Sequence, residues 1–193
     1  MGFTMPALRK QISASLAVCL LLAGGWAMAQ ADAFRVRALT GVFDGELLYA
    51  EARIDYRLTA TVQQALENGV ALVIAQELRL EKPRWWWRNA RLVELDRRYR
   101  LQYHAISRRY VMTWLASGDS RSFRTLDALL QELGRIEAWP VTRAERLTPE
   151  TDYELRLQSR LEVESLPRLL RTVALTESDW QLESQPWTAV VER

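Results

Sequence analysis

Four stretches of this sequence alternate apolar and polar residues with a period of two, and this alternation constrains the fold more than any other feature. Between Leu48 and Leu58 the even positions are apolar, whereas the odd positions from 51 to 57 carry charged side chains. A period of two is typical of strands with one buried face, and strands with one wet face favour antiparallel sheets. The same alternation recurs over residues 72–81, 93–103 and 153–164.

Two hairpins connect these predicted strands. Asp44-Gly45 predicts a two-residue turn between strands 34–43 and 46–58, because glycine readily takes the positive φ that such a turn requires. The segment 106–115 follows strand 93–103 closely, so the two are expected to pair as a second hairpin.

Two short segments have helical spacing instead. Thr61–Gln64 fits a capping box, and Gly69 is placed to end that helix. Apolar residues over 126–136 recur at helical spacing, with Thr125 as the expected N-cap and Gly134 as the expected end.

The C-terminal part of the sequence is less regular. Leu166-Pro167 interrupts the strand pattern, and one further strand is expected at 169–175. Several short strands with two short helices predict a mainly β fold: an antiparallel β-sandwich whose helices cover its ends or edges. An α+β layer of one sheet and helices is the alternative.

The N-terminal segment has the pattern of a signal peptide. Arg9 and Lys10 precede an apolar run from Ile12 to Ala23, and Ala27-Met28-Ala29 supplies the small residues that signal peptidase reads. The run is shorter than the roughly twenty residues that cross a bilayer. Residues 1–29 are therefore expected to be a cleaved signal peptide and residues 30–193 a single periplasmic domain. An uncleaved signal that anchors the chain in the inner membrane is the alternative.

Removal of this segment changes the charge and the cysteine content. The chain has 26 Lys and Arg against 24 Asp and Glu, and two of the basic residues, Arg9 and Lys10, lie in the signal. The remaining domain is formally neutral, which argues against a nucleic-acid partner, since phosphate binding needs excess basic charge. Cys19 also leaves with the signal, so the domain has no disulfide and depends on its core.

The residue inventory of the domain offers little for catalysis. It holds no cysteine and one histidine, His104, so thiol nucleophiles and the usual zinc ligand sets are excluded. No nucleophile elbow surrounds a serine, and no glycine-rich phosphate loop is present. Carboxylates such as Glu51 and Asp55 alternate with core positions and neighbour arginines, as on a solvated sheet face. We expect no enzyme activity, no cofactor and no metal.

The unusual feature is a basic run that contains three consecutive tryptophans. In an extended backbone Trp85 and Trp87 point to one side and Trp86 to the other, so at least one indole is expected outside the core. Indoles beside arginines suit a protein contact, a membrane headgroup zone or a sugar. The alternative is that the tryptophans plug one end of the sandwich.

The charge distribution supports a binding surface near this run. Residues 79–124 hold twelve basic and four acidic side chains, a local excess of eight positive charges. Such an excess favours an anionic partner surface unless acidic strands lie beside it. The expected partner-binding residues are Arg84, Trp85, Trp86, Trp87, Arg88, Arg98, Arg100 and Arg108.

The order of motifs resembles a known family. The stretches are Ala65–Val70, Pro83–Trp87, Arg98–His104, Ser122–Leu126, Gly134–Pro140 and Ser178–Trp180. They resemble exported bacterial proteins grouped as domain of unknown function 4390, and the resemblance spans nearly all of the expected domain. It implies no activity, cofactor or catalytic residue. It does imply a periplasmic accessory or sensory partner, because genes of the family often lie beside that of a sensor histidine kinase.

Taken together, these features predict a periplasmic, non-enzymatic domain that binds an envelope or inner-membrane protein, with peripheral membrane contact through the tryptophans as a further expectation. The alternative function is a binding protein for a small apolar or glycan ligand held within the sandwich. The sequence leaves the oligomeric state open.

Overall fold

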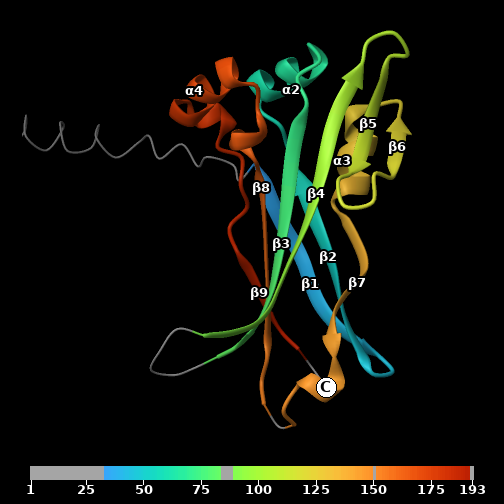
Figure 1. The fold of residues 1–193 in the computed structure, drawn as a ribbon, viewed down its shortest axis with the longest axis vertical. Coiled ribbons are helices and arrows are strands. Elements are labelled where there is room, and N and C mark those ends of the chain that lie inside the picture. The colour runs from blue at the N-terminus through green and yellow to red at the C-terminus, as the bar shows by residue number, and fades with distance from the viewer. Residues whose placement is uncertain (1–32, 84–88, 150, 192–193) are drawn as a thin grey trace, which may run out of the picture. The chain divides into compact units, whose positions relative to one another are not determined.

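The computed structural model describes residues 33–83, 89–149 and 151–191, all within one compact unit, Asp32–Arg193. They form two antiparallel sheets packed as a sandwich, which confirms the predicted fold class (Figure 1). The small sheet has the order β1-β2-β7 and the large sheet the order β6-β5-β4-β3-β8-β9. The strands are β1 (Phe34–Asp44), β2 (Leu47–Tyr56), β3 (Leu72–Lys82), β4 (Ala90–His104), β5 (Arg109–Trp114), β6 (Ser120–Phe123), β7 (Arg135–Arg143), β8 (Glu154–Leu161) and β9 (Trp187–Val190).

The alternating residues of the two sheets meet in one core. Leu78 of β3 and Leu157 of β8 are directly paired, and both are buried. Leu48 and Ile54 of β2 are buried from the opposite side. Because every second side chain of these strands leaves water, each fully buried leucine contributes about 1.5–3 kcal/mol of hydrophobic free energy. The four alternating stretches therefore form β2, β3, β4 and β8, as predicted.

One charged side chain interrupts the apolar face of β4. Arg97 occupies an inner position, and its guanidinium carbon lies 4.3 Å from the centre of the Trp139 ring and 5.6 Å from that of Trp114. The negative face of an indole attracts a cation. The two tryptophans therefore accommodate a charge that the apolar interior would otherwise disfavour.

Both predicted hairpins form, with small shifts. The first has Asp44 paired with Leu47, so its two-residue loop is Gly45–Glu46, one residue later than expected. Gly45 has a φ of 57°, which explains why a glycine is needed in that loop. In the second hairpin His104 pairs with Arg109, so the strand begins three residues after Ile106.

Two helices occur where the sequence predicts them. In α2 (Ala60–Glu67) the N-cap is Thr59, not Thr61: the Thr59 hydroxyl accepts a hydrogen bond from the Val62 N–H at 3.3 Å. Thr61 instead donates to the Asp179 carboxylate at 2.6 Å. In α3 (Leu126–Leu133) Thr125 is the N-cap as predicted, and its hydroxyl accepts from the Ala128 N–H at 3.2 Å.

The strand predicted at 169–175 is wrong, because this segment is the helix α4 (Arg168–Thr176). Ala174 is buried, and Leu170, four residues earlier, is partly covered on the same side of the helix. Leu169 is 90% exposed. Contacts that repeat every four residues stabilise a helix, whereas the alternate residues of 169–175 have no common core to face.

The connecting helices mark the two ends of the sandwich. β1 begins and β2 ends beside α2 and α4, together with the short 3₁₀ helices η2 (Val163–Ser165) and η3 (Ser178–Trp180) (Figure 1). The third 3₁₀ helix, η1 (Ala144–Arg146), follows β7 at the other end. Within the described ranges, no helix has both the length and the apolar character to cross a membrane.

A buried polar cluster joins the two sheets. The Ser159 hydroxyl of β8 donates to the Ala75 carbonyl at 2.9 Å, so its contact with the Tyr56 hydroxyl, also 2.9 Å, requires Tyr56 to be the donor. The Gln76 amide nitrogen donates to the Tyr56 oxygen and to the Leu133 carbonyl, each at 2.9 Å. These bonds link β2, β3, β8 and the end of α3 inside the core.

The stability of the protein is expected to fall at alkaline pH because of Tyr56. Burial raises the pKa of its phenol well above the ordinary value near 10, against smaller opposing effects of its bonds with Ser159 and Gln76. The unfolded chain loses this proton above pH 10 while the folded chain keeps it. The free energy of unfolding should therefore drop by about 1.4 kcal/mol per pH unit from this group. Urea titrations between pH 9 and 11 should show a shallower decline for Tyr56→Phe; an unchanged slope would contradict this assignment.

Candidate binding site

Five of the eight predicted partner-binding residues lie outside the described residues: Arg84, Trp85, Trp86, Trp87 and Arg88. Their neighbours Lys82 and Ala90 are paired at the end of the β3–β4 ladder. From Ala90, β4 runs for 15 residues to His104, a length of about 45 Å at 3.3 Å per residue. The loop 83–89 and the β4–β5 turn therefore join β4 at opposite ends.

The other three predicted residues lie on or beside β4. Arg98 and Arg100 share the outer face of the large sheet. The Arg98 Nε lies 3.0 Å from a carboxylate oxygen of Glu162 and 3.4 Å from one of Asp96, so its charge is largely compensated. Arg108 lies in the β4–β5 turn with a φ of 50°. The structure thus brings Arg98 and Arg100 together and places Arg108 at the other end of β4 from Lys82 and Ala90.

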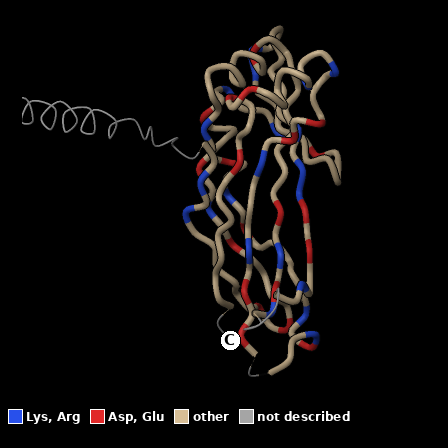
Figure 2. The backbone as a smooth tube through the Cα atoms, turned by 90° about the vertical axis from the view of Figure 1, so that its left-hand side faces the viewer, with Lys and Arg blue, Asp and Glu red and all other residues tan. Residues whose placement is uncertain are grey.

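Much of the local positive charge is compensated by neighbouring strands. Arg79 Nε lies 2.9 Å from Glu94, and Arg160 of β8 lies 2.7 Å from Glu77. The hydrogen bond from Arg79 also lowers the pKa of Glu94. Figure 2 shows acidic and basic residues interspersed along neighbouring strands. Exposed pairs of this kind contribute roughly 0–1 kcal/mol each, and they make this face a mixed surface instead of a purely basic one.

A different feature stands out on the small sheet: one edge of β1 has no strand partner among the described residues. In the described part of the chain β1 pairs only with β2. The Ala33 carbonyl accepts from the Arg57 N–H at 2.7 Å, so Ala33 and Arg35 direct their backbone groups toward β2. In an antiparallel pair the residues between them face the other way. The N–H and C=O groups of Phe34 and Val36 therefore point away from β2, at an edge where these two residues are 0% and 3% exposed.

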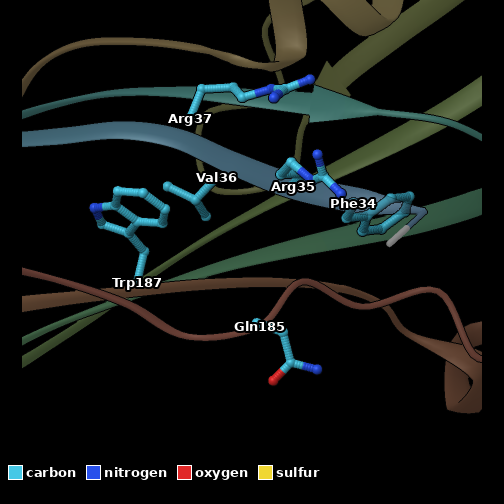
Figure 3. A pocket seen from close by; sticks show the side chains of 6 residues that line it. All are labelled: Phe34, Arg35, Val36, Arg37, Gln185 and Trp187. Atoms are coloured by element: carbon cyan, nitrogen blue, oxygen red, sulfur yellow. The ribbon is translucent and has the colours of Figure 1, made fainter. Parts of the chain in front are cut away.

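A groove runs along this edge, between the start of β1 and the segment before β9 (Figure 3). Its volume is about 390 Å³. Trp187 pairs with Leu157, an inward-facing residue, so its indole points toward the small sheet. In Figure 3 the ring lies opposite Val36, and it remains 44% exposed. The residues that line the groove are Phe34, Arg35, Val36, Arg37, Gln185 and Trp187.

Local irregularities on both sides shape the groove. β1 has a bulge between Val36 and Ala38. On the other side Ser184, not a strand residue, exchanges hydrogen bonds with Ser159: its hydroxyl accepts from the Ser159 N–H and its N–H donates to the Ser159 carbonyl. Between the Arg160–Glu183 bridge and the Leu157–Trp187 pair, the segment before β9 therefore holds one residue more than β8. Further along β1, Val191 approaches Gly41 closely enough that a Cβ there would lie 3.3 Å from Val191 Cγ2. The β1 residues that line the groove are all at the beginning of the strand, from Phe34 to Arg37.

A second hollow, of about 490 Å³, lies between the inner face of β5 and α3. Tyr99, Met112 and Trp114 form its apolar part, while Arg121 and Glu132, which form an ion pair, lie on its polar side. Trp114 Nε1 is buried and has no acceptor among the described residues. An apolar wall with one unsatisfied donor is the arrangement that the small-ligand alternative requires.

Comparison with known proteins places the chain in a family. The family model described as "Domain of unknown function (DUF4390)" matches residues 31–190. The chain is a DUF4390 protein. No curated protein and no solved structure matches this DUF4390 chain. The match covers every described strand and helix, so the sandwich with its open β1 edge is the fold of a DUF4390 domain.

In the described part of this DUF4390 domain, no group of three or more His, Cys, Asp or Glu side chains is placed to hold a metal ion. His104 is the exposed last residue of β4, opposite Arg109.

Sequence reasoning missed the groove of the DUF4390 domain. Phe34 and Trp187 come from opposite ends of the chain, and no local pattern connects them. One signal was available: Arg35 and Arg37 alternate with Phe34 and Val36, so the first residues of β1 read as a strand with an apolar inner face. That pattern predicts the strand but does not show that its outer edge is unpaired.

Proposed function

We propose that this protein is an exported, non-enzymatic domain of the cell envelope that binds an extended segment of another envelope protein along the open edge of β1. The observation that carries the proposal is the edge of β1 at Phe34 and Val36, which has no strand partner among the described residues and lies beside a groove walled by Trp187. Because Phe34 and Val36 are almost completely buried, the added segment has to displace the side chains that cover them. In strand addition the main-chain hydrogen bonds give affinity, and side-chain pockets beside the edge give specificity. Both components are present here within a few residues.

The state of this edge supports a binding role. Exposed strand edges are aggregation hazards that proteins usually shorten, cover or charge. β1 is 11 residues long, and the groove lies beside its first four residues, Phe34–Arg37. Its beginning carries the bulge and the two exposed arginines, Arg35 and Arg37, which limit indiscriminate pairing. An edge left open only over Phe34–Arg37 suits a short peptide and disfavours a whole sheet.

The experiment is photo-crosslinking in living cells from three positions. A photoreactive residue replaces Gln185, which lines the groove, or Val42, which lies on the outer face of β1 beyond Gly41. We expect one envelope protein to be captured from position 185 through a short extended segment, and a synthetic peptide of that segment to compete. Equal capture from positions 185 and 42 contradicts the proposal. Position 86 tests separately the sequence-based prediction that the tryptophan run binds the partner.

The hollow beside Trp114 favours a second candidate function, the binding of a small apolar or glycan ligand. An indole N–H without an acceptor is a donor that a ligand oxygen would satisfy after a small rearrangement of the ring. A ligand with about 100-fold excess over its Kd stabilises the fold by about 2.7 kcal/mol. A thermal-shift screen of glycans and lipids should then find a compound whose effect disappears in Trp114→Phe; a screen without such a compound rejects this function.

A further inference from the structure

We infer that the segment received by β1 alternates apolar and acidic residues. This inference rests on the proposed function, since it specifies which peptide the open edge of β1 selects. Two properties of the edge lead to it: the register that β1 imposes on an added strand, and the charges beside the groove.

The pleat of β1 determines the two faces of any strand added to it. Phe34 and Val36 direct their side chains inward and are buried, whereas Arg35 and Arg37 direct theirs outward and are exposed. Side chains of neighbouring strands point to the same face at paired positions. Alternate residues of the bound segment therefore lie beside Phe34 and Val36, and the residues between them lie beside Arg35 and Arg37.

The inner positions require apolar side chains. They enter the groove of about 390 Å³ between β1 and Trp187, whose inner wall is formed by the apolar side chains of Phe34, Val36 and Trp187. A polar side chain that packs against this wall would lose water without gaining a hydrogen bond from it. Branched residues such as valine suit such a position, because they pack well against neighbours on a pleated surface.

The outer positions favour carboxylates. The outer faces of β1 and β2, with Arg57 directly after β2, carry Arg35, Arg37, Arg53 and Arg57 against Glu51 and Asp55, so the formal charge of these six residues is +2 (four minus two). Arg35 already has an interaction partner, and it is exposed. Arg37 Nε is already 2.6 Å from Asp55, but the Arg37 side chain remains 48% exposed, with room for a second carboxylate. Opposite charges at paired positions of adjacent strands attract, whereas like charges repel.

Three peptides test this pattern on the purified protein by titration calorimetry. Each alternates valine with one other residue over seven positions: aspartate, serine or lysine. Aspartates of the peptide would pair with Arg35 and Arg37, and two such cross-strand pairs should make the aspartate peptide bind about fivefold or more tightly than the serine peptide. The lysine peptide should bind most weakly, because its charges repel the two arginines. The preference should shrink at high salt, since the charges are exposed.

Two variants make the result specific. Arg35→Gln with Arg37→Gln should bring the aspartate and serine peptides to equal affinity, whereas Arg156→Gln, on the outer face of β8 in the large sheet, should leave the preference unchanged. If all three peptides bind the original protein with equal affinity and each slows amide exchange in β1, the segment still binds at β1 but its charges do not matter. That result overturns the inference and leaves the proposed function standing. Absence of binding by all three overturns the inference; if crosslinking from position 185 also captures nothing, the proposed function fails with it.

Discussion

Gly134→Ala is expected to destabilise the protein by about 3 kcal/mol or more, at the upper end of what added core volume costs. Gly134 follows α3 and has ordinary helical backbone angles, so a left-handed conformation is not the reason for the glycine. The reason is the approach of β2: the Ile54 N–H donates to the Gly134 carbonyl at 2.8 Å. A Cβ would collide with the Ile54 carbonyl oxygen and lie 3.1 Å from its carbon. Both partners are backbone, so neither side relaxes cheaply.

Urea denaturation of Gly134→Ala beside Gly118→Ala measures this effect. Gly118 has a φ of 79° and nothing within 4 Å of an added Cβ, so its replacement carries only the strain of the left-handed region, about 1–2 kcal/mol. Gly134→Ala should therefore lose clearly more stability than Gly118→Ala. A Gly134→Ala protein as stable as the original would show that the approach of β2 to α3 is not as the structure describes.

Trp187→Ala is expected to weaken binding of the valine–aspartate peptide by about thirtyfold, since a truncated aromatic at the centre of an interface typically costs 2 kcal/mol or more. The indole forms one wall of the groove opposite Val36. Because 44% of the residue is already exposed, its removal should lower the free energy of unfolding by only about 1 kcal/mol. The variant thus separates binding from stability.

Val42→Ala is the matched control for this measurement. Val42 is also 44% exposed and lies on β1, but on its outer face and beyond Gly41. It should bind the peptide as the original protein does. If Val42→Ala and Trp187→Ala weaken binding to the same extent, the effect reflects a general loosening of β1 and not the wall of the groove.

The fold was predictable where a strand contributes many residues to the core. β2, β3, β4 and β8 each place at least four side chains inward, so their alternation is visible in the sequence. β6 and β9 are four residues long and contribute too few inward residues to produce a pattern. Strands of that length are recognised only from the neighbour to which they pair.

The helix α4 shows a different limit. Its sequence holds leucine, valine and threonine, which are compatible with a strand, and the preceding Pro167 breaks the earlier pattern without specifying whether a helix or a strand comes next. The burial of Ala174 against the end of the sandwich decides for a helix, and that contact is tertiary. Local propensity is a weak guide wherever such packing is available.

The candidate site depended on long-range pairing still more strongly. The sequence supports a binding role for the arginines of β4, yet it does not show that Glu162, from the end of β8, reaches Arg98. Likewise, the groove exists because β1 and β9 are the terminal strands of two different sheets. Which strands become edges is a property of the topology, and hydrophobic periodicity carries no information about it.

The most direct test of the central claim is amide hydrogen exchange at Phe34 and Val36, with and without the valine–aspartate peptide. If the peptide adds to β1 as a strand, both N–H groups gain acceptors, and their exchange should slow by about tenfold or more, while Arg35, whose backbone already faces β2, changes little. Unchanged exchange at Phe34 and Val36 under saturating peptide would contradict strand addition at this edge.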